Sequence, residues 1–339
     1  MKQIRLVIGG IVVCVVGSMA IAKLLSTFIS LPTTPVESTK PTLVIEQATP
    51  TPAPQCATLL FGGDMMFDRH IREKAQVKGN YDLIFDSLAP LFSEADAIVA
   101  NLEGPVTDFP SRSVGSEIGS TNNYFFTFDP KVVVETLAQW PFIVNLGNNH
   151  ILNFGQEGLS QTYRYLEDSG LPHFGYTQPA QEELSYVFKE INSITFGFVN
   201  YNQFVTGGQE QAFSDIAEIR DSVEVLVVYT HWGNEYVQEN QVIKDLAHQF
   251  IDAGADLVIG SHPHVVQGVE DYMGKKTYYS LGNFVFDQYF EEGVQNGLLV
   301  ETIVCRSTDS QSFDWKFIDY PIQLLITGET VLKSVKTEK

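Results

Sequence analysis

The sequence has 339 residues, of which 44% are hydrophobic, and a formal net charge of -20 at pH 7. This length suits one large domain or two small ones, with additions at the ends. The negative charge argues against nucleic acid as a partner, because binding to a phosphate backbone requires a basic surface. The same charge is compatible with a location outside the cell and with a site where cations offset local negative charge.

The first thirty residues predict an export segment that is separate from the fold. Two basic residues precede an uncharged apolar run over 6–22, and Lys23 follows it. The run is at the lower limit of the about 17–25 residues that cross a bilayer as a helix, and the basic residues place the amino terminus in the cytoplasm. Ala20-Ile-Ala22 also fits a signal-peptidase site. We favour a single-pass anchor in residues 1–30, with secretion after cleavage near Ala22 as the alternative.

Residues 31–56 are rich in proline and threonine and predict a disordered linker. They carry too few apolar side chains to offset the entropy of ordering the chain. Closely spaced prolines favour extended conformations, so this segment would act as a semi-rigid spacer. A spacer suits a domain that is held away from a membrane, and this is why we favour the anchor.

The three cysteines, Cys14, Cys56 and Cys305, have no spacing typical of a zinc site or a disulfide framework. Cys56 and Cys305 could pair only if the fold made them neighbours, and we expect instead that they are unpaired. A low number of cysteines suits an exported bacterial protein that folds without disulfides.

The first half of the globular part alternates between strands and helices. Short apolar runs that end at glycine or polar residues predict buried strands, and apolar residues at helical spacing predict helices. In chain order these elements are a strand at 58–64, a helix at 82–93, strands at 97–103 and 125–128, a helix starting at 129–130, a strand at 142–146 and a helix at 158–169.

The second half continues this alternation and then adds a run of strands. The predicted elements are two strands within 186–201, a strand at 223–230, a helix at 242–253, a strand at 256–260, a hairpin within 265–279 and strands at 298–305 and 313–325. Alternating strands and helices predict an α/β fold, to which the last strands add antiparallel pairing.

Five of the predicted strands end in residues of types that bind metals. These residues are Asp64, Asn101 with Glu103, Asn149 with His150, His231, and His262 with His264. Each of them alone has an ordinary explanation as a turn, cap or surface residue. Together they point to one site, because strand ends of an open α/β sheet meet at one edge. Carboxylate, amide and imidazole ligands suit Mn, Fe or Zn, and two such ions can hold a hydroxide and a phosphoryl group.

A set of short motifs occurs in a characteristic order along residues 58–305. The motifs are Gly63-Asp64-Met-Met, Asn101-Leu-Glu-Gly-Pro-Val-Thr107, Asn148-Asn-His150, His231-Trp-Gly-Asn-Glu-Tyr236, Gly254-Ala-Asp256, His262-Pro-His-Val265 and Tyr279-Ser-Leu-Gly-Asn-Phe-Val-Phe-Asp-Gln288. Their order resembles the CapA family of poly-γ-glutamate capsule synthesis proteins, which is related to calcineurin-like metallophosphatases. The resemblance implies, for residues 57–305, a metallophosphatase-like sandwich of two mixed β-sheets flanked by helices. Residues 306–339 would add strands that complete this domain, and a tail.

The same resemblance implies a site for one or two divalent ions and assigns roles to its residues. The metal ligands would be Asp64, Glu103, Asn149, His231, His262 and His264. His150 would act as a general acid toward a leaving group. Arg69 and Asn101 would support the ligands or contact the substrate.

Three positions depart from the metallophosphatase pattern. Met66 stands where the histidine of the first motif is usual, Glu103 replaces a Gly-Asp-x-x-Asp motif, and Asn153 replaces the aspartate that follows Asn-His. These departures leave open whether both metal positions are filled and whether the protein is an enzyme.

The resemblance implies an exported, membrane-anchored bacterial protein that acts in the synthesis or export of an anionic capsule polymer such as poly-γ-glutamate. One class of function is a metal-dependent hydrolase of a phosphoester or an amide polymer, which the intact histidine set favours. The other is a non-catalytic component that binds the polymer within a membrane synthesis complex, which Met66 favours.

Overall fold

The computed structural model describes residues 55–175, 185–307 and 312–333. The predicted membrane anchor and nearly all of the predicted linker lie outside the described residues. Within the described ranges, no helix is long and apolar enough to cross a membrane.

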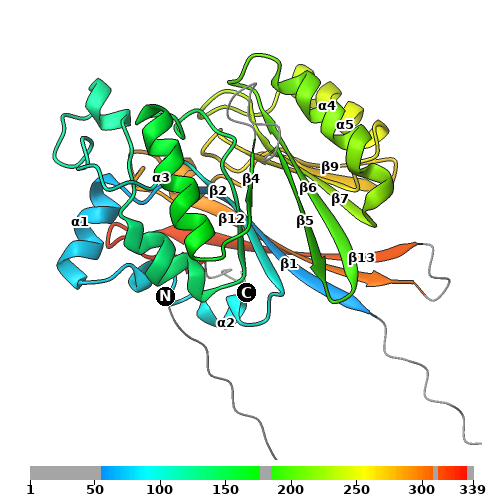
Figure 1. The fold of residues 1–339 in the computed structure, drawn as a ribbon, viewed down its shortest axis with the longest axis horizontal. Helices are drawn as coiled ribbons and strands as arrows, with labels where there is room; N and C mark the ends of the chain where they lie inside the picture. The colour runs from blue at the N-terminus through cyan, green and yellow to red at the C-terminus, as the bar shows by residue number, and fades with distance from the viewer. Residues whose placement is uncertain (1–54, 176–184, 308–311, 334–339) are drawn as a thin grey trace, which may run out of the picture. The chain divides into compact units, whose positions relative to one another are not determined.

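Two mixed β-sheets pack face to face, and helices cover the outer face of each sheet (Figure 1). The eight-stranded sheet has the order β14 (Thr330–Leu332), β13 (Phe313–Leu324), β12 (Asn296–Arg306), β1 (Cys56–Met65), β2 (Ala97–Leu102), β3 (Phe142–Asn145) and β4 (His173–Phe174), with β11 (Asn283–Val285) also paired to β1. The six-stranded sheet has the order β5 (Tyr186–Ile191), β6 (Ile194–Asn202), β7 (Val225–His231), β8 (Leu257–Ser261), β10 (Lys275–Tyr278) and β9 (Val269–Tyr272). The predicted sandwich of two mixed sheets flanked by helices is confirmed.

The core has three parts, one between the two sheets and one between each sheet and its helices. Side chains that alternate along the central strands contribute to two of these parts at once. In β1, Leu59 and Phe61 pack between the two sheets, whereas Leu60 packs beneath the helices of the eight-stranded sheet. In β7, Val227 faces the other sheet and Val228 faces the helices of its own sheet. Strands with two buried faces read as continuous apolar runs, which is why the sequence revealed them.

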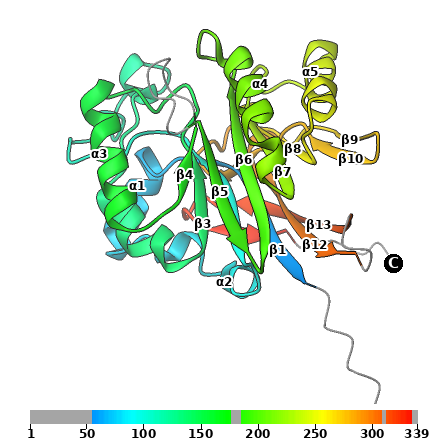
Figure 2. The ribbon, with the colours of Figure 1, turned by 45° about the vertical axis from the view of Figure 1, so that its right-hand side comes forward.

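The helices lie in two groups, one on each sheet. The helices are α1 (Arg69–Lys78), α2 (Ala89–Phe92), α3 (Gly155–Asp168), α4 (Gly208–Ile219), α5 (Gln241–Asp252) and α6 (Glu292–Gln295). Shorter turns are the 3₁₀ segments Asp82–Ile84, Thr121–Tyr124, Leu137–Gln139 and Arg220–Ser222 and the π segment Val132–Thr136. Figure 2 shows α4 and α5 beside the six-stranded sheet, with α1 and α3 on the opposite side of the sandwich.

Several predicted elements differ in the structure. The predicted helix over 82–93 is two short helical segments, because Pro90 lies in the first turn of α2 and has no backbone N–H to continue a helix from the residues before it. Residues 125–128 form only an isolated bridge, at Phe128, and no strand. Helices α1 and α4 were not predicted, since polar residues make up most of α1 and half of α4 and obscure the apolar stripe.

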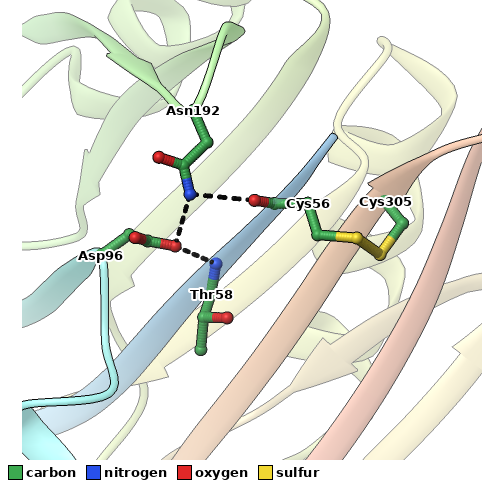
Figure 3. The surroundings of a disulfide bond; sticks show 5 residues. All are labelled: Cys56, Thr58, Asp96, Asn192 and Cys305. Carbon is green, nitrogen blue, oxygen red and sulfur yellow. Dashed lines mark hydrogen bonds between the residues drawn. A yellow bond between two sulfur atoms is a disulfide. The ribbon is translucent and has the colours of Figure 1, made fainter. Parts of the chain in front are cut away.

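The expectation that the cysteines are unpaired is wrong for Cys56 and Cys305, which form a disulfide (Figure 3). The two residues are direct partners in the antiparallel pairing of β1 with β12. Beside the disulfide, Asn192 of the β5–β6 turn donates hydrogen bonds to the Cys56 carbonyl and to Asp96. The disulfide therefore closes the first residue of β1 onto the end of β12, in a corner where the two sheets also meet.

Candidate metal centre

The carboxyl ends of strands from both sheets meet at one buried site. Asp64 of β1 is the register partner of Asn101 of β2 in one sheet. His231 of β7 is the register partner of Ser261 of β8 in the other sheet. All four side chains are fully buried, so each polar group in the site needs a partner within the protein or a bound ion.

Asp64 occupies the middle of the cluster. Its Oδ1 accepts a hydrogen bond of 2.7 Å from Asn101, and its Oδ2 accepts one of 2.9 Å from the backbone N–H of His262. The same carboxylate lies 3.7 Å from His231 Nδ1 and 3.5 Å from His264 Nδ1. Burial raises the pKa of Asp64 to about 6, against the opposing effect of these hydrogen bonds.

Glu103, His262 and His264 have ligand atoms that all lie within 4.8 Å of one another. Both carboxylate oxygens of Glu103, and Nδ1 of His262, are buried and have no hydrogen-bond partner among the described residues. Buried polar atoms without partners are costly unless an ion or water satisfies them. A carboxylate and two imidazoles form a donor set that suits a divalent transition ion, so these residues fit such an ion.

Hydrogen bonds orient two imidazoles of the cluster, and in His264 they leave Nε2 free to bind a metal. His264 donates from Nδ1 to Asn283 Oδ1 over 2.9 Å, and its Nε2 lies 3.7 Å from Glu103 Oε1. In His231, Nδ1 lies 3.0 Å from the Ser261 hydroxyl oxygen and 3.3 Å from Asn101 Nδ2, which can only donate. Because Nδ1 accepts from Asn101, the ring proton of the metal-free protein lies on Nε2. Neighbours of this kind fix the tautomer of a metal-binding histidine.

Asn149 is exposed, but its side chain reaches the cluster. Its Oδ1 accepts a hydrogen bond of 2.9 Å from His231 Nε2. A bound cation would displace the Nε2 proton and take both atoms as ligands. Asn149 therefore lies where an amide ligand is expected.

Burial shifts the ionisable groups of the cluster toward their uncharged forms. It raises the pKa of Glu103 well above its usual range, with the nearby Asp64 charge as a further cause. It also lowers the pKa of His262 to about 4 and the pKa of His231 and His264 well below the usual value. Neutral imidazoles are the form that binds metals, and a divalent ion would restore the carboxylates to their charged form.

His150 lies at the edge of the cluster, with Nε2 3.9 Å from Glu103 Oε1. Asn153 donates to its Nδ1 over 3.2 Å, which places the ring proton on Nε2. Burial, followed by the charge of Arg69, lowers the pKa of His150 to about 4. At neutral pH the ring is uncharged and offers a hydrogen bond from Nε2.

Asn101 and Arg69 occupy different places around the site. Asn101 supports Asp64 and accepts hydrogen bonds from Asn145 and Asn148. Arg69 lies outside the cluster and forms an ion pair with Asp287.

Several supporting residues were not predicted as part of the site. They are Asn145, Asn148, Ser261, Asn283 and Asp287. Asparagine directly after an apolar strand was the available signal, but it is equally typical of turns. Met66 packs in the core, where its sulfur accepts from the backbone N–H of Asp68, so this position contributes no imidazole ligand.

Backbone strain is concentrated at this site. Among the described residues, seven other than glycine have positive φ: His262 (95°) and His264 (58°) belong to the cluster, and Arg69 (47°) and Tyr236 (63°) lie near it. Such conformations are costly and persist where the surrounding structure holds them for function. A cavity of about 580 Å³ lies at the amino-terminal ends of β7 and β10, away from this site, and includes none of the candidate ligands.

Comparisons with known proteins agree with the order of the motifs. The family model described as "Bacterial capsule synthesis protein PGA_cap" matches residues 58–288. The PGA biosynthesis protein CapA of Bacillus subtilis (strain 168) is 31% identical over 248 residues, and the match covers 67% of this chain and 63% of that protein. The capsule biosynthesis protein CapA of Bacillus anthracis is 29% identical over 252 residues, covering 68% and 60%. The chain thus spans less than two thirds of the length of these two relatives.

A crystal structure of a hypothetical protein from Thermus thermophilus is also similar to this chain. It is 15% identical, with a TM-score of 0.46, and the match covers 78% of this chain and 99% of that one.

Proposed function

Because the chain belongs to the bacterial capsule synthesis protein family described as PGA_cap, we propose that it acts in the synthesis or export of a poly-γ-glutamate capsule. The names of its two Bacillus relatives, a PGA biosynthesis protein and a capsule biosynthesis protein, support this role. The polymer is the substrate or the bound partner, and other components of a membrane synthesis complex are its neighbours.

The protein performs this role through a divalent-metal centre formed by Asp64, Glu103, Asn149, His231, His262 and His264. Two observations carry the proposal: among the described residues, Glu103 and His262 have buried atoms without partners, and ligand atoms of Glu103, His262 and His264 lie within 4.8 Å of one another. The ion is Mn, Fe or Zn, since the donors are carboxylate, amide and imidazole.

Metal analysis of the purified full chain tests this centre. We expect at least one bound divalent ion per chain in the wild type and its loss in the double variant His262→Ala/His264→Ala. The variant His248→Ala is the control, because His248 bonds Glu270 on the surface and lies outside the cluster. A wild-type protein without metal, or a double variant with equal metal, would overturn the proposal.

As a hydrolase, the protein would cleave a phosphoester or an amide bond of the polymer. The bound metal would supply a hydroxide nucleophile and polarise the scissile group. His150 would donate a hydrogen bond from Nε2 to the leaving group, in the tautomer that Asn153 selects. Hydrolysis of an aryl phosphate with added Mn²⁺ tests this role, and we expect its loss in His150→Ala.

The second candidate function is non-catalytic binding of the polymer within the synthesis complex. Two observations favour it: Met66 packs in the core in place of a ligand, and the partner of His150 is the uncharged Asn153 rather than a carboxylate. Retained binding of poly-γ-glutamate without hydrolysis, in wild type and in His150→Ala alike, supports this function over the first.

The globular domain would lie outside the cytoplasm, held by a single-pass anchor in residues 1–30. The Cys56–Cys305 disulfide supports this placement, because such bonds persist in oxidising compartments. An amino-terminal tag tests the anchor: its retention on the cell-associated protein agrees with an uncleaved anchor, and its loss indicates secretion after cleavage near Ala22.

A further inference from the structure

A cleft of about 320 Å³ opens beside the metal centre. Its lining includes Arg69, Asn123, Tyr124, Tyr236, Gln288 and Phe290. The Tyr236 ring lies 6.0 Å from the His264 ring, and Gln288 donates to the Tyr236 hydroxyl over 3.0 Å. Asn283, which orients His264, also donates to Gln288. One hydrogen-bonded chain therefore joins the wall of the cleft to a candidate metal ligand.

Arg69 is the cationic side chain of this cleft, and it is held rigidly. Its guanidinium lies 5.1 Å from the centre of the Phe126 ring and 5.4 Å from that of Phe286. Phe126 in turn contacts His150, and Phe286 contacts His264. The guanidinium thus stands one aromatic ring away from two imidazoles of the centre, within reach of a ligand that spans both.

The guanidinium of Arg69 retains hydrogen-bond donors after its contacts within the protein. Asp287 takes Nη2, and the contact from Nη1 to Asn123 is long at 3.5 Å. Nε is buried and has no partner among the residues that the structure describes. The side chain is only 12% exposed and its backbone lies in the left-handed region. A buried arginine with unused donors is a pre-formed receptor for an oxyanion.

The charge balance of the cleft favours a monoanion. Asp287 forms an ion pair with Arg69, so the pair has no net positive charge to attract a phosphate dianion, and the Asp287 carboxylate would repel it. A carboxylate carries half that charge and can accept from the donors that the guanidinium retains. Most of the remaining lining is aromatic, at Tyr124, Tyr236, Tyr289 and Phe290, and such surfaces bind short apolar segments.

We propose that this cleft is a subsite for a carboxylate carried on a short apolar chain, with Arg69 as the residue that selects it. This inference rests on the proposed function, because each unit of a γ-linked glutamate polymer carries one carboxylate beside two methylene groups. Arg69 then positions one unit of the polymer next to the metal ligands, and the aromatic walls cover its methylene groups.

Calorimetric binding of a γ-linked glutamate decamer to the full chain with Mn²⁺ tests the subsite. We expect Arg69→Gln to weaken binding by about 10–100-fold, the usual effect of losing hydrogen bonds to a charged group, and Arg69→Lys to recover part of the loss. Arg112→Gln is the matched control, since Arg112 also lies over a phenylalanine and bonds an asparagine, but on the exposed side of its loop. It should bind as the wild type does.

Two further arms identify the chemistry of the ligand. A decamer whose carboxylates are converted to methyl amides should not bind, and inorganic phosphate should not displace the unmodified decamer. Displacement by phosphate, binding of the amidated decamer, no decamer binding by the metal-loaded wild type, or equal binding by Arg69→Gln each overturns the proposal.

Metal content separates this failure from failure of the metal centre. Arg69→Gln should retain the metal of the wild type, because Arg69 contacts no candidate ligand. A wild type without metal overturns the proposed function, whereas a metal-loaded Arg69→Gln that binds the decamer normally overturns the subsite alone.

Discussion

At the scale of single residues, the hydrogen bond from His264 to Asn283 decides which nitrogen faces the metal centre. Asn283 is fully buried, and its amide nitrogen is already used by Gln288 and by the Val294 carbonyl. Its oxygen therefore has to face the imidazole. The orientation of His264 follows from this one asparagine.

Replacing Asn283 by alanine should lower metal affinity by about 10–100-fold, because residues that orient a ligand have effects of this size. The dissociation constant for Mn²⁺, measured by calorimetry on the full chain, checks this. Asn122→Ala is the control, since Asn122 bonds Arg112 on the surface, away from the cluster. An affinity equal to the wild type would contradict the assignment of His264 as a ligand held by Asn283.

Protonation of His262 should govern part of the acid stability of the metal-free protein. Burial lowers its pKa to about 4 in the folded state, whereas an unfolded histidine has a pKa of about 6.5. The unfolded state thus binds more protons between these values, and the free energy of unfolding decreases as pH falls from about 6.5 to about 4. Asp64 acts in the opposite direction, because its folded pKa is raised to about 6.

The variant His262→Gln isolates this contribution, because Asp64 is present in both proteins. In urea titrations of metal-free protein, the wild type should lose stability more steeply than the variant as pH falls through this window. Parallel pH profiles would show that His262 is not held uncharged in the folded protein.

At the scale of elements, β1 carries the site and has almost no free space around its end. A side-chain carbon added at Gly63 would lie 1.9 Å from the Gly282 carbonyl oxygen, and one added at Gly62 would lie 2.4 Å from the Phe284 ring. The two glycines therefore allow β1 and the segment at Gly282 to approach closely, directly before Asp64.

Gly63→Ala should destabilise the protein and reduce its metal content, because the backbone at Gly282 has to move and displaces Asp64 with it. Denaturant unfolding and metal analysis measure the two effects. Gly293→Ala is the matched control, since a carbon there would meet only Val265 at an ordinary 3.4 Å. A Gly63→Ala protein with wild-type stability and metal content would contradict this account of the close approach.

The strands and the ligand-bearing ends were predictable, whereas their supports were not. Apolar runs such as Phe142–Asn145 have both faces buried, so composition alone marks them as strands. The histidines at strand ends were recognised because the composition also showed where each apolar run ends. Asn283 and Ser261 were not recognised, because their roles depend on contacts between segments that are far apart in sequence.

At the scale of the whole molecule, one covalent bond joins the beginning of the described fold to its late strands. Cys56 and Cys305 are 249 residues apart. Sequence alone did not predict their pairing, because nothing in either segment reveals that β12 returns antiparallel to β1 in this register. The division into anchor, linker and domain stays a prediction.

Replacing both cysteines by serine should lower the free energy of unfolding by about 2–5 kcal/mol, since the bond restricts the unfolded chain. Urea unfolding of the wild type and of Cys56→Ser/Cys305→Ser measures the difference. Metal content should not change, because the disulfide and Asp64 lie at opposite ends of β1. Equal stability of the two proteins would contradict the presence of the bond in the purified chain.

The position of this disulfide also determines how the domain responds to a pulling force. A load on the amino-terminal side enters the described fold at Gln55 and reaches Cys56 next. There it passes through the disulfide into β12, which pairs with β13 along its whole length. The load is shared by two long strands and does not peel β1 from its neighbours. Asp64, at the far end of β1, lies outside this path.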